Sequence, residues 1–170
     1  MTGHAADDDF QEAFPGMFHA AYHVAYRILG DVTGAEDAAA EAVARALVSW
    51  RRVGRLEHRT AWVARVAGNL AIDEVRRARR RRDRPAPASS PAADTTEDAA
   101  LRVALGTALA ALSTRQREVI ALRYLADLDE AEVSRVLGIS VNSVKKHAAR
   151  GRAALRARLG TLQEVSLALD

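Results

Sequence analysis

ISVNSVKKHAARGRAALRARL, residues 139–159, is the stretch that decides the fold. Ser140 is a good N-cap, because its hydroxyl can accept a hydrogen bond from an N–H one turn into a helix. Small and apolar residues then recur at spacings of three and four, which places on one helix face Val144, Ala148, Gly151, Leu155 and Leu159. The other face carries Asn142, Ser143, Lys145, Lys146, Ala149 and Arg150. A helix with an apolar back and a basic front suits the major groove of DNA.

The residues before this helix predict a second, shorter one. Asp129 can cap a helix over Glu130 to Leu137, and Gly138 follows where a left-handed C-cap is needed. Helix, short turn and helix make up the helix-turn-helix pattern. An ordinary helical hairpin with a solvated basic face is the alternative. No Asp or Glu lies between Glu132 and Glu164, so the sequence indicates an uncompensated basic face.

Composition favours helix over strand, because aromatic residues are only 5% and Ala, Leu and Val supply most of the apolar residues. The net charge of +3 hides a separation of charge along the chain. Acidic residues crowd the first 41 residues and the linker, whereas Arg and Lys crowd residues 76–84 and 135–158. Clustered basic residues and a sequence pI near 9.8 predict a polyanionic partner. The chain contains no cysteine, which excludes disulfides, Cys-ligated zinc and thiol nucleophiles. An acidic start and the lack of a long apolar run predict a soluble, cytoplasmic protein without membrane insertion.

The first half is expected to hold three helices. A frayed tail over residues 1–9 precedes a helix from Phe10 to Leu29, which Pro15 and Gly16 interrupt. Residues 35–50 form the second helix, whose acidic stripe is either a solvated face or a docking surface for a basic partner. Thr60 is expected to cap the third, which runs into the arginines of residues 76–82. That run is either a solubilising tail or a phosphate contact, and its place beside a second basic domain favours the contact.

Both tryptophans, Trp50 and Trp62, continue apolar periodicities and are expected in the core rather than as base-stacking platforms.

Residues 84–98 hold three of the four prolines and predict a flexible linker. In the second half, Ser113 and Gln116 predict a capping box that opens a helix over residues 114–124. The predicted fold is therefore all-α: one small helical domain over residues 8–82, a flexible linker over 83–99 and a helix-turn-helix domain over 100–160.

Four stretches together resemble bacterial sigma factors of the extracytoplasmic-function type. They are GAEDAAAEAVARAL, TAWVARVAGNLAIDEVRRARR, LSTRQREVIALRYLADLDEAEVSRVLGIS and VNSVKKHAARGRAALRARL. The resemblance spans residues 10–159 and breaks only at the linker. Its most specific parts are Asn69-Leu70-Ala71-Ile72-Asp73 and, ahead of the helix-turn-helix, Arg115 to Val119.

The resemblance implies a promoter-specificity subunit of RNA polymerase, with one domain like region 2 and one like region 4. The partners it implies are promoter DNA, the clamp helices and flap of core polymerase, and an anti-sigma protein. It implies −35 DNA contacts at Arg115, Asn142, Ser143, Lys145, Lys146, His147 and Arg150. It implies −10 contacts and strand opening at Arg55, His58, Arg59, Asn69, Asp73, Arg76 and Arg77, and polymerase contacts at Asp37, Glu41 and Arg45.

One departure weakens the match in the polymerase-docking helix. The family commonly has Gln after Asp-x-Val and an aromatic residue soon after, where this chain has Ala39, Ala40 and Val43. A stand-alone helix-turn-helix regulator is the competing interpretation, although such a protein has no need of a second basic domain. An enzyme is disfavoured, because the five histidines are scattered and Glu36, Asp37 and Glu41 have no histidine at ligand spacing. No metal or cofactor is expected.

Overall fold

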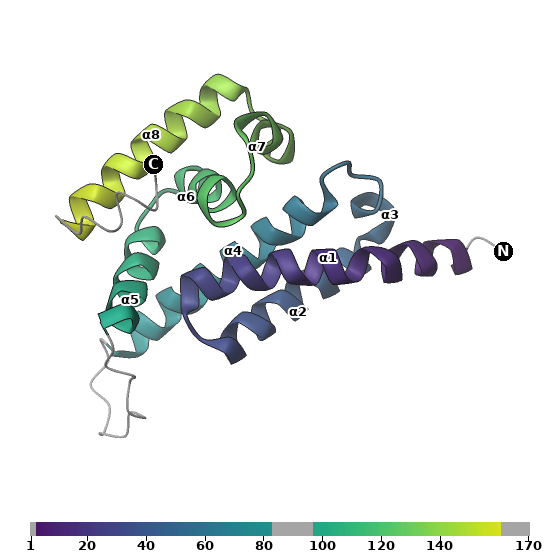
Figure 1. Ribbon diagram of the computed structural model, residues 1–170, viewed down its shortest axis with the longest axis horizontal. Coiled ribbons are helices and arrows are strands. Elements are labelled where there is room, and N and C mark those ends of the chain that lie inside the picture. The colour runs from purple at the N-terminus through teal and green to yellow at the C-terminus, as the bar shows by residue number, and fades with distance from the viewer. Residues whose placement is uncertain (1–2, 83–96, 161–170) are drawn as a thin grey trace.

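The computed structural model describes residues 3–82 and 97–160, and this part of the chain is helical without any strand (Figure 1). The all-α prediction is confirmed. The first half contains α1 (Gly3–Leu29), α2 (Val32–Val48), α3 (Trp50–Val53) and α4 (Arg59–Arg82). The second half contains α5 (Glu97–Ala110), α6 (Thr114–Ile120), the π-helical turn η1 (Ala121–Leu125), α7 (Glu130–Leu137) and α8 (Val141–Leu159).

The core of the first half lies between α1, α2 and α4, where mostly small side chains let the helices approach closely. Met17 and Ala21 of α1, Ala39 of α2 and Val63 of α4 are all fully buried there. Trp50 is 9% exposed and meets the ring of Phe10 edge to face, with ring centroids 5.0 Å apart. Trp62 is half-buried against the same core. The prediction that both tryptophans serve the core is confirmed.

Three expectations about the first half are wrong. The helix α1 already begins at Gly3, inside the expected tail, and it continues through Pro15. Proline costs the helix one N–H bond, but the turns after it are held by burial of Met17 and Ala21. Thr60 does not cap α4: the N–H of Trp62 donates to the carbonyl of His58 at 3.0 Å. That bond is the first of the helix, so the cap position falls on His58.

The second half departs from its prediction at two places. The helix α5 begins at Glu97, so the last three residues assigned to the linker are helical; residues 83–96 lie outside the described part. The helix expected over residues 114–124 is α-helical only to Ile120 and widens into the π turn η1. The N–H of Ala126 closes that turn by donating to the carbonyl of Ala121 at 3.0 Å. The predicted Ser113–Gln116 capping box is present.

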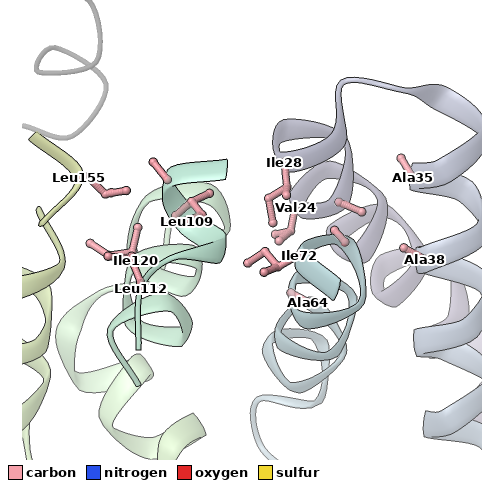
Figure 2. Close-up of a cluster of buried hydrophobic side chains, with 13 residues drawn as sticks. Val24, Ile28, Ala35, Ala38, Ala64, Ile72, Leu109, Leu112, Ile120 and Leu155 are labelled. Atoms are coloured by element: carbon pink, nitrogen blue, oxygen red, sulfur yellow. The ribbon is translucent and has the colours of Figure 1, made fainter. Parts of the chain in front are cut away.

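The two halves pack against each other through one continuous apolar cluster. Figure 2 shows Leu109, Ile120 and Leu155 of the second half across the boundary from Val24 and Ile28 of α1. Side chains also cross that boundary to backbone carbonyls. Arg76 of α4 donates to the Ala110 carbonyl from Nε at 3.1 Å and from Nη2 at 2.7 Å. Arg27 of α1 donates to the carbonyls of Tyr124 and Leu125 at 3.1 and 3.2 Å.

Candidate nucleic-acid interface

The pair α7 and α8 has the geometry that the sequence predicts. The carboxylate of Asp129 accepts the backbone N–H of Glu132 at 2.7 Å, which lowers the pKa of that carboxyl. Gly138 ends α7 with a left-handed φ of 63°, and the hydroxyl of Ser140 accepts the N–H of Ser143 at 3.2 Å. These caps set the turn between the helices. The chain therefore contains a complete helix-turn-helix.

The back of α8 is buried and its front faces solvent. Val144, Ala148, Gly151 and Leu155 are buried, as predicted. A Cβ on Gly151 would lie 2.8 Å from Cγ1 of Ile120, so glycine is what allows α8 to approach α6 this closely. On the front, the exposed residues among those expected to contact DNA are Asn142, Lys145, Lys146 and Arg150. Two others, Ser143 and His147, are half-buried. This face can enter a groove with the helix held rigidly from behind.

The expectation of an uncompensated basic face is wrong at one residue. Nζ of Lys145 lies 3.6 Å from Oε2 of Glu130 at the start of α7. The partner comes from the neighbouring helix, which counting acids along α8 cannot detect. Both side chains are substantially exposed, so the pair contributes between zero and about 1 kcal/mol. Arg115, also expected at DNA, is exposed on α6 and paired with Glu118 at 3.0 Å.

The seven residues expected at the −10 strand do not form one cluster. Arg55 and His58 lie in the connection before α4, and Arg59 is the first residue of that helix. The other four, Asn69, Asp73, Arg76 and Arg77, lie along its later turns. At 1.5 Å per residue, Arg59 and Arg76 are about 25 Å apart along the helix axis. The structure thus arranges these residues as a strip, and a strip suits an extended strand better than a single base.

Several members of this strip already have partners within the protein. Arg59 pairs with Asp9 at 3.2 Å and lies over the ring of Trp50. Nε2 of His58 accepts a hydrogen bond from Nε of Arg135 of α7 at 2.7 Å. Arg77 pairs with Glu74 at 3.2 Å. Together with the bonds from Arg76 to Ala110, these contacts mean that the second half covers part of the strip.

A buried arginine lies in α6 at the boundary with α4. Arg117 is 5% exposed, and its Nε and Nη1 have no hydrogen-bond partner among the described residues. Its Nη2 donates to the hydroxyl of Thr114 at 3.4 Å. Burial and the nearby guanidinium of Arg76 lower the pKa of Arg117, which Asp73 and Glu118 oppose. A buried charge with unpaired N–H donors is destabilising. The sequence does not indicate that Arg117 is buried.

The residues expected to dock on polymerase, Asp37, Glu41 and Arg45, are all exposed on α2. Nε of Arg45 lies 2.7 Å from Oε1 of Glu41. Sequence reasoning missed an apolar seam beside them, formed by Ala40, Ala44, Leu47 and Val48. Leu47 is 50% exposed and Val48 is 89% exposed. Their spacing of i, i+4, i+7 and i+8 was visible in the sequence as a second apolar stripe on the same helix.

Neither a metal cluster nor a membrane span is found in the described part of the chain. No group of three or more histidine, cysteine, aspartate and glutamate side chains is placed to hold an ion there. None of the described helices is both long enough and apolar enough to cross a membrane.

Two family models match the chain, one to each half. The model of sigma-70 region 2 matches residues 18–81, and that of sigma-70 region 4 matches residues 102–155. A curated relative is the ECF RNA polymerase sigma factor SigM of Mycobacterium tuberculosis, found in two strains. It is 31% identical over 103 residues, which are 61% of this chain and 53% of the relative. The chain thus spans about half the length of the curated relatives it matches.

Two solved structures share the fold. The sigma factor RpoE in complex with the anti-sigma factor NepR, from Bartonella quintana, is 22% identical with a TM-score of 0.56. The match covers 91% of this chain and 98% of that one. CnrH in complex with the cytosolic domain of CnrY is 25% identical with a TM-score of 0.58, and the match covers 91% and 94% of the two chains.

Proposed function

The chain belongs to the sigma-70 family, in its extracytoplasmic-function group, and from that premise we propose that it binds core RNA polymerase and directs transcription from selected promoters. The observation that carries the proposal is the pairing, in one chain, of a helix-turn-helix with a basic front and an arginine-rich helix. The first suits duplex DNA and the second suits a phosphate strand. The chain would supply binding energy while polymerase performs the chemistry, and it would act in the cytoplasm with the DNA.

The exposed front of α8 would occupy the major groove of the −35 element, with Lys145 and Arg150 reaching bases or phosphates. Arg115 would contact the same element from α6. The strip along α4 would bind the −10 strand once the duplex opens. Opening needs no covalent step, because a captured, unstacked base offsets a melting cost of a few kcal/mol. Asp37, Glu41 and Arg45, with the seam that ends at Val48, would contact the clamp helices of polymerase, and the second domain would contact the flap.

Run-off transcription with purified core polymerase tests this function directly. We expect transcripts from a subset of promoters only when this chain is added. Val48→Asp is expected to abolish them without unfolding the protein, because Val48 is 89% exposed and an aspartate there would be desolvated at the polymerase contact. The control is Val32→Asp at a 50% exposed position, about 24 Å away on the same helix. DNA binding without holoenzyme formation would instead favour a stand-alone helix-turn-helix regulator.

A second test concerns the −35 contact. Lys145→Ala and Arg150→Ala are each expected to weaken binding to a −35 duplex by about 1–3 kcal/mol if the contact is to a base. A phosphate contact would instead weaken binding equally on all sequences and lower its salt dependence. Mobility-shift titrations measure both. Arg158→Ala, an exposed charge in the last turn of α8, is the matched control, and unchanged binding by the two test variants would remove them from the interface.

We also propose an anti-sigma protein as a partner. The structural relative RpoE is described in complex with an anti-sigma factor. In this chain the second half already covers His58 and Arg76 of the strip. A protein that held the two halves in this arrangement would keep the strip from DNA without touching it.

A further inference from the structure

Two histidines form an isolated pair on the outer face of α1. His19 and His23 are both exposed, and their ring centroids lie 4.2 Å apart with an interplanar angle of 74°. Residues four apart on a helix are neighbours on one face. The opposite face of α1 is fixed in the core, where Met17 and Ala21 are fully buried and Val24 is 1% exposed. The backbone that carries the two rings is therefore rigid.

The imidazole nitrogens of this pair are available to a ligand. In the described part of the chain, neither ring has a hydrogen bond or an ion pair; the only contacts are between rings, with each other and from His23 to Tyr22. Arg27 is the next residue along the same line of the helix. Its guanidinium donates to the carbonyls of Tyr124 and Leu125, so it is held toward the second half of the chain.

We propose that His19 and His23 bind one divalent transition-metal ion of the borderline class, such as Zn²⁺, Ni²⁺ or Cu²⁺. Neutral imidazole is the commonest protein ligand for these ions. Two histidines at i and i+4 on a helix also supply two of the zinc ligands in helices with the His-Glu-x-x-His motif. The same spacing occurs here as His19-Ala20-Ala21-Tyr22-His23. The site is independent of the proposed function and uses no residue assigned to it.

The structure also defines what kind of site this is. No third histidine or carboxylate joins the pair among the described residues, so water fills the other coordination positions. Such a site is open and exchanges its ion, unlike a structural zinc centre. Affinity is expected to follow the general order for nitrogen ligands, with Cu²⁺ bound more tightly than Ni²⁺ or Zn²⁺. By joining successive turns, the ion would also stabilise α1, since a ligand that binds only the folded state raises stability.

The test is a titration of the tag-free chain with ZnCl₂, followed by calorimetry and by the NMR signals of the histidine rings. We expect saturable binding of one ion, with shifts confined to two of the five histidines and a rise in melting temperature. His19→Gln and His23→Gln should each remove the saturable step and the rise. His147→Gln, which alters a lone histidine on α8, should change neither.

A spacing control separates chelation from general histidine binding. The double variant His19→Gln/Ala157→His keeps five histidines on the chain but places the new one at an exposed position of α8, with no histidine, aspartate or glutamate three or four residues away. It should behave like His19→Gln. Zinc binding that survives in this variant or in either single variant would overturn the proposal, as would the absence of saturable binding by the unaltered chain.

Discussion

Leu155→Ala is expected to lower the free energy of unfolding by about 2–5 kcal/mol, the range for removing a buried leucine side chain. Leu155 is fully buried at the back of α8, in the cluster that includes Ile120 and Leu109 of the second half and Ile28 of α1. The truncation would leave a cavity where these helices meet. Because Gly151 already sets a close approach of α8 to α6, the helices have little room to collapse into that cavity.

Urea unfolding followed by circular dichroism measures this loss. Leu56→Ala is the matched control, because the same atoms are removed from a side chain that is 38% exposed. Substitutions at exposed positions usually change stability by less than about 0.5 kcal/mol. If the two variants unfolded at the same urea concentration, Leu155 would not join the halves as described.

The second large effect is expected from locking the two halves together. A Cβ added at Gly68 of α4 would lie 3.8 Å from Cβ of Ala121 in η1, the average separation across a disulfide. The chain has no cysteine, so Gly68→Cys/Ala121→Cys would introduce a single pair. Oxidation is expected to abolish run-off transcription, because His58 and Arg76 then stay covered by the second half. Dithiothreitol should restore it.

The lock carries its own controls. The new Cβ at Gly68 lies 3.2 Å from Cγ1 of Val24, so the side chains there must shift slightly. The reduced double variant therefore sets the reference activity. Run-off transcription by each single variant should be the same with and without the oxidant. Full transcription by the oxidised, cross-linked chain would show that the arrangement of the two halves does not limit access to the strip.

The sequence predicts best where structure is local. The caps at Ser113, Asp129 and Ser140 and the left-handed Gly138 each depend on residues within one turn, and all four are confirmed. Pro15 shows the limit of local rules, since burial of the following turns outweighs the lost hydrogen bond.

The site is less predictable because its geometry is tertiary. The pairing of Lys145 with Glu130 and the covering of Arg76 by Ala110 join residues that no spacing rule connects. The exposed seam at Leu47 and Val48 and the pair His19–His23 are different cases. Their spacings are plain in the sequence, but a pattern alone does not tell an exposed face from a buried one.

Arg117 has a consequence for how the two halves separate. Its Nε and Nη1 have no partner among the described residues where α6 lies against α4, and water would reach them if the halves parted. Rehydration of that guanidinium offsets part of the free energy needed to expose the apolar side chains around Ile120 and Leu155 to water. Separating the halves therefore costs less free energy than the apolar contact alone would require, and a ligand that prefers the parted form needs correspondingly less differential affinity to shift the equilibrium.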